Sequence, residues 1–419
     1  TAVQRGDPEI ENKLNKVIRA CIELGDNNPI ESIHDQGAGG LGNVVKEIVD
    51  PTGGWINIRR TTQGTSNMSA LDIWTSEFQE TNTCLVDSSN LDVIKSICVR
   101  EHLPYDILGM VANNGKMCVH DSIEKKKVVD LDLRHILSEI PQKQYVLTKK
   151  ENNFLPLLLN TESKISSYIK SVLKSISVGS KQFLTNKVDR SVSGLIAQQQ
   201  CVGIKHLPIS DYAVIAQSHF DIKGAVTAIG EQPIKGVINP ISMAHMAVGE
   251  MLTNMMWVKI PSIRNIKCSG NWMWPLKQDG EKHALYEACN AMCDMMKIIG
   301  ISIDGGKDSL SMSTKIDNEY VKSPRSLVIS GYSDCDDIAD KVTAEFKRSD
   351  SSIIFVDIGR GRNSIDGGAF AHINGQFGCD PPTLTTDDMI DLKNLFEIVQ
   401  ECIHKKYILA GHDVSDGGL

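Results

Sequence analysis

Oxygen-bearing side chains at two places in the 419-residue sequence could bind a magnesium ion. Asp211 precedes a short apolar run, while Glu250 and Asn254 stand four positions apart and so share one face of a helix. That helix is rich in Met and Ala, which predicts that it is largely buried. A buried carboxylate is costly unless it is paired or bound to a metal. The pattern indicates either a magnesium site or an internal hydrogen bond of Glu250 at a helix contact.

A glycine turn that occurs twice is the second candidate. The pattern His-Asp-x-x-x-Gly-Gly-Leu occupies residues 34–41 and again 412–419, 378 positions later. In the second copy Asp413 projects from the turn, Ser415 adds a hydroxyl, and the glycines let backbone N–H groups approach a phosphate. A plain strand-to-helix turn with an Asp or Ser N-cap is the alternative, but it does not require His-Asp in both copies. We expect the two histidines to orient the turns rather than act as bases.

A third candidate surrounds Lys307, in the segment Asp304–Met312. Two glycines followed by Lys and Ser resemble a phosphate loop, although the spacing GxxxxGK[ST] is not met. A turn entering a strand explains the same residues. Lys307 is therefore a candidate contact for a nucleotide phosphate.

The elements that must position these residues alternate between helix and strand, which favours an α/β class. Apolar spacing and capping residues predict helices over 7–25, 43–48, 241–257, 282–299 and 387–403. Short apolar runs predict strands over 29–33, 213–216, 326–330, 353–358 and 407–410. Charged, weakly patterned stretches near residues 150 and 348 suggest three domains, 1–150, 151–348 and 349–419, and the distant repeat suggests two homologous halves.

Composition excludes several classes of protein. A net charge of −8 argues against a protein that binds the nucleic-acid backbone, and an aromatic content of 5% argues against a surface for stacked bases. No apolar run reaches the length of a membrane span. The 11 cysteines are scattered without a CxxC pair, which favours reduced thiols and a cytoplasmic location over a zinc site or disulfides.

Taken together, these motifs resemble the phosphoribosylformylglycinamidine synthases of the large single-chain type. The similar segments follow the family order along nearly the whole chain, and the match is loose only between about 120 and 180. They are residues 2–8, 34–40, 184–194, 198–203, 230–233, 249–254, 268–274, 305–312 and 412–419.

The resemblance implies an ATP-dependent ligase of purine biosynthesis that converts formylglycinamide ribonucleotide to the amidine with glutamine-derived ammonia. It implies two pseudo-symmetric halves of the aminoimidazole ribonucleotide synthetase-like fold, and Mg²⁺ and ATP or ADP as cofactors. By this resemblance the magnesium ligands are Asp211, Glu250, Asn254 and Asp413. Ser210 and Ser415 fall on nucleotide contacts, with a backbone contact favoured at Ser210, and Asp35 takes the equivalent place in the first half.

The chain also departs from the family pattern. The family's glycine-rich ATP loop and catalytic His would lie before Thr1, and its glutaminase domain would lie after Leu419. We therefore expect a central piece of a longer polypeptide that is inactive alone. The alternatives are a non-catalytic nucleotide-binding homologue, or another ATP-using member of the superfamily. Those other members have much shorter halves, so a motif that recurs 378 positions later argues against them.

Overall fold

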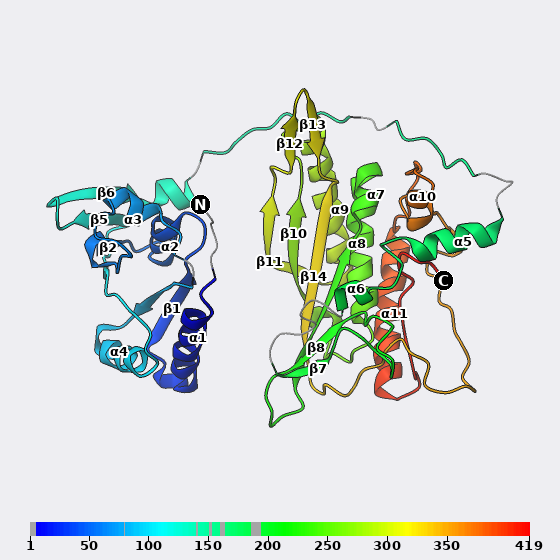
Figure 1. The fold of residues 1–419 in the computed structure, drawn as a ribbon, viewed down its shortest axis with the longest axis horizontal. Helices are drawn as coiled ribbons and strands as arrows, with labels where there is room; N and C mark the ends of the chain where they lie inside the picture. The colour runs from blue at the N-terminus through cyan, green and yellow to red at the C-terminus, as the bar shows by residue number, and fades with distance from the viewer. Residues whose placement is uncertain (1–5, 79, 140, 151–152, 160–163, 186–193) are drawn as a thin grey trace. The chain divides into compact units, whose positions relative to one another are not determined.

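The computed structural model describes residues 6–419 apart from 79, 140, 151–152, 160–163 and 186–193. Two compact units make up the chain, Thr1–Gln144 and Tyr145–Leu419 (Figure 1). The expected boundary near residue 150 lies close to this division. Most of the family-like segment 184–194, and the start of the segment 2–8, fall outside the described residues.

The first unit contains a four-stranded sheet in the order β4-β2-β5-β6 and a separate antiparallel pair, β1 with β3. Its strands are β1 Ile30–Asp35, β2 Gly54–Asn57, β3 Asn82–Val86, β4 Gly109–Val111, β5 Lys116–Asp121 and β6 Lys126–Asp132. Its α-helices are α1 Pro8–Glu23, α2 Gly40–Ile48, α3 Ala70–Thr75 and α4 Leu91–Arg100. The side chain of Asp7 caps α1 by accepting the N–H groups of Glu9 and Ile10, so the helix begins where the sequence predicts.

A six-stranded sheet in the order β11-β10-β14-β9-β8-β7 organises the second unit. Neighbouring strands are antiparallel except for β10 and β11. The bounds are β7 Ile196–Gln198, β8 Ala213–Ala216, β9 Gly224–Glu231, β10 Lys267–Met273, β11 Ser302–Ser309 and β14 Ser326–Cys335, with a hairpin of β12 Ser313–Ile316 and β13 Glu319–Lys322. The α-helices are α5 Ile165–Lys174, α6 Gln182–Thr185, α7 Pro233–Ile238, α8 Pro240–Met255, α9 Glu281–Ile299, α10 Ala369–Ile373 and α11 Thr386–His404.

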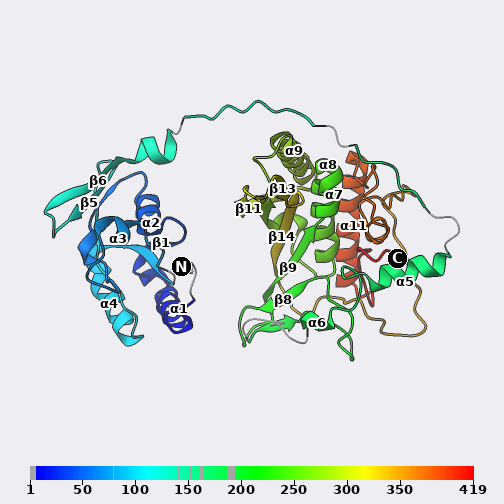
Figure 2. The same cartoon turned by 45° about the horizontal axis from the view of Figure 1, so that its top comes forward.

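Three long helices enclose the core of the second unit. Helix α8 packs against β9 and β14, α9 packs against α8, and α11 packs against α9 (Figures 1 and 2). These are the helices expected over 241–257, 282–299 and 387–403. Helix α9 ends at Ile299, as predicted, and is followed by Gly300, whose φ is +93°. Helix α11 comes from the expected third domain, and its packing joins that segment to this core. Within the described residues, no helix combines the length and the apolar character needed to cross a bilayer.

Two predicted strands are wrong. Residues 353–358 and 407–410 pair with no strand among the described residues. Ile353 and Ile354 are 79% and 82% exposed. An apolar run becomes a strand only where a neighbouring backbone accepts its hydrogen bonds, and that partner is not determined by the run itself.

Gly230 marks the close approach of β9 to α8. A Cβ at this position would lie 2.0 Å from the carbonyl oxygen of Ala247 and 2.5 Å from the amide nitrogen of Met251. We expect Gly230→Ala to lower the free energy of unfolding by about 3 kcal/mol, because two backbones must separate. Gly249→Ala, on the same helix, is the control: its Cβ would meet Leu384 at 3.6 Å, and helix propensity predicts a gain of about 1 kcal/mol. Urea unfolding measures both, and equal effects would contradict the close approach.

Candidate metal and nucleotide site

An acidic cluster forms where the loop before β8 meets the segment after α11. Asp211, His412 and Asp413 each offer a ligand atom, and these atoms lie within 4.8 Å of one another, although Asp211 and His412 are 201 positions apart. The side chains of both aspartates are only 6% exposed. At Gly411 an added Cβ would fall 2.1 Å from the ring of Trp257, so a glycine lets this segment reach Asp211.

The charges in the cluster are only partly balanced. His412 Nδ1 lies 2.7 Å from Asp211 Oδ1 and 3.5 Å from Asp413 Oδ1. The hydrogen bond to Asp211 raises the pKa of His412. Burial, then the nearby charge of Asp211, raise the pKa of Asp413 to about 6 even though His412 opposes this rise. The structure therefore places His412 next to both aspartates, and the paired His-Asp motif was its sequence signal; the orienting role expected of it stays a prediction.

Glu250, on α8, is not part of that group of ligand atoms within 4.8 Å, but it is near enough to Asp413 for the two charges to interact. Glu250 Oε2 accepts the N–H of Glu231 at 2.7 Å and the side-chain amide of Gln232 at 2.9 Å. Burial raises the pKa of Glu250, these two hydrogen bonds lower it, and the charges of Asp413 and Asp416 raise it again. Both hydrogen bonds fall on Oε2, so within the described part of the chain Oε1 stays open to a cation. The internal hydrogen bond and the magnesium site are thus compatible.

Asn254 lies one helical turn beyond Glu250. Its Nδ2 donates to the carbonyl oxygen of Ile229 at 2.9 Å. This bond fixes the amide and directs its nitrogen to the backbone of β9, which leaves its oxygen as the group suited to a metal.

The donor set fits magnesium. Carboxylate and amide oxygens are the ligands of a hard divalent cation. A buried pair of aspartates, one of which resists ionisation, is the charge arrangement that such a cation would relieve. Asp211, Glu250, Asn254 and Asp413 would hold the ion, and it would neutralise charge on bound phosphates.

The two serines next to the cluster differ in whether their hydrogen-bond donors already have acceptors within the protein. Ser210 donates its hydroxyl to the carbonyl of Tyr212 at 2.7 Å and its N–H to the carbonyl of Gln200 at 2.8 Å, so neither donor is directed to a ligand. Ser415, two residues after Asp413, accepts the N–H of Gly418 at its carbonyl, and its exposed hydroxyl remains a candidate contact.

The structure does not bring Lys307 to the cluster. The segment Asp304–Ser309 belongs to β11, at one edge of the sheet, and β10, β14 and β9 separate it from β8. A Cβ at Gly306 would lie 2.1 Å from the carbonyl oxygen of Gly270, so the glycine serves strand packing rather than a phosphate loop. The Lys307 amine donates to the carbonyl of Asp308 at 2.7 Å.

The first copy of the motif has the predicted strand, turn and helix but no comparable cluster in the described residues. Asp35 ends β1 with its side chain 85% exposed. His34 Nε2 lies 2.9 Å from Glu47 Oε2, on α2. The two copies of the motif therefore differ in their surroundings: His34 contacts Glu47 and Asp35 is exposed, whereas His412 contacts Asp211 and Asp413 is buried.

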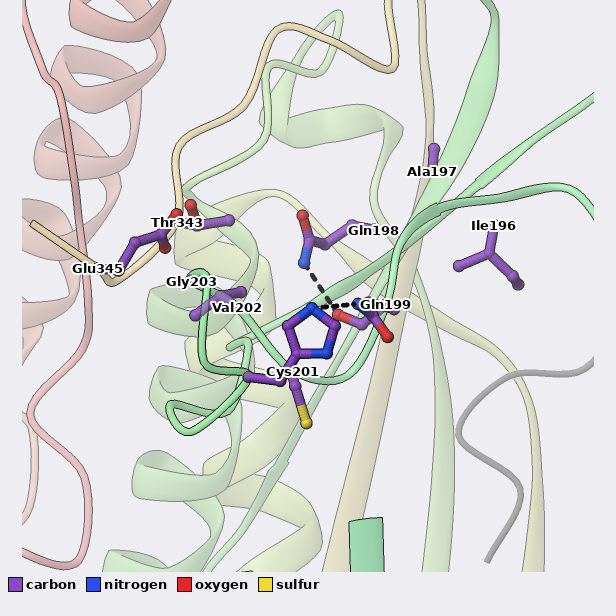
Figure 3. Close-up of a pocket in the computed structure, with 10 residues that line it drawn as sticks. Ile196, Ala197, Gln198, Gln199, Cys201, Val202, Gly203, Thr343 and Glu345 are labelled. Atoms are coloured by element: carbon purple, nitrogen blue, oxygen red, sulfur yellow. Dashed lines mark hydrogen bonds between the residues drawn. The ribbon is translucent and has the colours of Figure 1, made fainter. Parts of the chain in front are cut away.

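A pocket of about 560 Å³ is lined by residues from 196–206 together with Thr343 and Glu345, and no cluster residue lines it. Figure 3 shows Thr343 and Glu345 on one side of it and residues 196–199 on the other. The segment at Val342 and Thr343 contacts the sequence neighbours of the cluster. The hydroxyl of Tyr212, next to Asp211, donates to the carbonyl of Val342, and Gly411, next to His412, donates its N–H to the carbonyl of Thr343. Glu345 Oε2 is buried without a partner in the described part of the chain.

Comparisons with known proteins agree with this fold. A model described as "AIR synthase related protein, C-terminal domain" matches residues 1–121, and one described as "FGAR-AT PurM_N-like domain" matches residues 180–334. Thermotoga maritima PurL complexed with ATP has a TM-score of 0.61 at 16% identity, covering 82% of this chain and 52% of that one. The expected α/β class with aminoimidazole ribonucleotide synthetase-like halves is confirmed.

Curated relatives extend over the whole chain. The probable phosphoribosylformylglycinamidine synthase of Arabidopsis thaliana is 45% identical over 431 residues, which cover all of this chain and 30% of that protein. The human phosphoribosylformylglycinamidine synthase is 42% identical over 435 residues, covering 32% of its length. The chain belongs to the phosphoribosylformylglycinamidine synthase family, and it spans about a third of the length of these relatives.

Proposed function

We propose that the acidic cluster binds magnesium together with ADP or ATP, with Asp211, Glu250, Asn254 and Asp413 as metal ligands and Ser415 as a nucleotide contact. The convergence of two buried aspartates from segments about 200 positions apart carries the proposal. A solved protein of the same fold is named as a complex with ADP, which supports a nucleotide as the ligand.

We further propose that the site serves the reaction of the named relatives, as a ligase acting on formylglycinamide ribonucleotide, ATP and glutamine-derived ammonia. Magnesium would supply charge neutralisation for the phosphates. The chain's own residues would position the ligands. Glu231, at the end of β9, and Gln232 fix Glu250 of α8 by hydrogen bonds, and His412 fixes Asp211. The expectation that this chain is inactive alone stays a prediction. The expected cytoplasmic location also stays a prediction, and the name of the Arabidopsis thaliana relative reads chloroplastic/mitochondrial.

The binding proposal predicts a ligand-dependent rise in thermal stability. A ligand at a hundredfold excess over its Kd stabilises the folded chain by about 2.7 kcal/mol. We expect Mg²⁺ with ADP to raise the melting temperature, ADP with a chelator to raise it far less, and Glu250→Gln to weaken Mg·ADP binding about tenfold, because one metal ligand loses its charge.

Glu397→Gln, an exposed change on α11, is the matched control and should bind as the wild type does. An unchanged melting temperature of the wild type with Mg·ADP would refute the proposal, as would equal binding by Glu250→Gln.

A further inference from the structure

A buried lysine lies near Glu250 and Asp416 and was not indicated by any motif in the sequence. Lys235, on α7, is only 8% exposed. A Cβ at Gly367 would lie 3.0 Å from Lys235 Cγ, so the lysine stem is packed beneath this glycine. Burial of the whole side chain, rather than of the stem alone, sets Lys235 apart from a surface lysine, whose charged end normally reaches water.

The ammonium of Lys235 is surrounded by negative charge without being paired. Burial lowers the pKa of Lys235, and the charges of Asp416, Glu250 and Glu231 raise it. These carboxylates are near enough to act electrostatically, but none forms an ion pair with Lys235 within the described residues. Its one hydrogen-bond acceptor there is Gln232 Oε1. An ammonium has three N–H donors, so donors remain for a ligand.

Gln232 links Lys235 to the expected metal site. Its carbonyl oxygen accepts from Lys235, and its amide nitrogen donates to Glu250 Oε2 at 2.9 Å. One side chain therefore fixes both the lysine and a candidate magnesium ligand. A cation held next to a metal site suits an anion that bridges the two, and phosphate oxygens have this chemistry.

We propose that Lys235 binds the phosphate chain of the magnesium nucleotide at the acidic cluster. Lys235 thus takes the role that the sequence suggested for Lys307. This assignment rests on the proposed nucleotide function, and it names a residue of the same site. A purely structural lysine, neutralising nearby carboxylates, would have the opposite effect on metal binding, since its removal would leave more negative charge for Mg²⁺.

The test is calorimetric titration of the full 419-residue chain with Mg·ADP, Mg·AMP and Mg²⁺ alone. Lys235→Met keeps the length of the buried stem and removes the charge. We expect it to weaken Mg·ADP binding about 10- to 100-fold, the range of one charge-assisted hydrogen bond. The loss should be smaller for Mg·AMP, and Mg²⁺ alone should bind no more weakly than to the wild type. Lys235→Arg, which keeps the charge, should retain most of the affinity and covers the case in which the Met variant does not fold.

Two further lysines complete the design. Lys393→Met is the matched control: Lys393 is partly buried on α11 and donates to the carbonyl of Ile298, so nucleotide binding should not change. Lys307→Met separates the two assignments. A loss in Lys307→Met without a loss in Lys235→Met would overturn the proposal, and so would wild-type affinity in Lys235→Met. If the wild type does not bind Mg·ADP at all, the proposed function itself fails. This outcome differs from failure of the Lys235 assignment alone, in which the wild type binds Mg·ADP and Lys235→Met binds it equally well.

Discussion

Asp413→Asn is expected to stabilise the metal-free chain at pH 7 and, in the same protein, to abolish stabilisation by Mg·ADP. The pKa of Asp413 rises from its ordinary value of 3.8 to about 6 because the carboxyl is buried and faces Asp211. At about 1.4 kcal/mol for each pH unit, ionising it in the folded state costs at most about 3 kcal/mol. The amide removes this penalty but also loses the contact with His412, so we expect a gain of about 1–3 kcal/mol.

The pH dependence of this gain has a definite sign. An unfolded Asp413 loses its proton near pH 4, while the folded one keeps it until about pH 6. The wild type therefore loses stability from this group as the pH rises between these values, and the penalty is complete above pH 6. The advantage of Asp413→Asn should be absent near pH 4 and full at pH 7.5.

Urea unfolding in a chelator at both pH values measures the change, and a thermal shift with Mg·ADP measures the lost ligand binding. Asp336→Asn, at an exposed carboxylate, is the control and should show neither effect. If the variant is less stable at pH 7.5 without metal and is still stabilised by Mg·ADP, Asp413 is neither destabilised by its buried charge nor a ligand of the metal.

Arg325→Leu is expected to lower the free energy of unfolding by about 3–5 kcal/mol, because it leaves a buried carboxylate short of its main partner. Glu281 is 0% exposed, and Arg325 donates to its two oxygens at 2.7 and 3.2 Å. Burial raises the pKa of Glu281, but hydrogen bonds from Arg325 and Lys322 more than offset this, so the pKa is lowered. The stabilisation is therefore present above the ordinary pKa of Glu281 and is lost as the pH falls.

Two matched variants separate the buried pair from a surface effect. Lys322 also contacts Glu281 but is 51% exposed, so Lys322→Met should cost less than about 1 kcal/mol. Replacing both Glu281 and Arg325 by Leu should recover most of the loss, since no buried charge is then unpaired. If the double variant is as unstable as Arg325→Leu in urea unfolding, the loss comes from packing instead. Arg325 also donates to the carbonyl of Gly236, so the single variant should disturb α7, which carries Lys235.

Local sequence was sufficient to predict the long helices and to identify the candidate acidic ligands. Helices α1, α8, α9 and α11 begin and end within two residues of the predicted positions, because capping side chains and apolar spacing act within a few turns of the chain. Asp211, Glu250 and Asp413 were identified from residue type and from resemblance to a family, which needs no coordinates.

Pairing between distant segments was decided only by the tertiary structure. The hairpin of β5 and β6 formed outside the predicted strands, while the apolar runs 353–358 and 407–410 formed no strand, because a strand depends on a partner that the local sequence does not specify. The same dependence placed Lys307 in an edge strand and buried Lys235 beside Glu250. Sequence by itself determined which side chains have the chemistry of a magnesium nucleotide site. The fold decided which of them share one space, because burial and distance are properties of the packed chain.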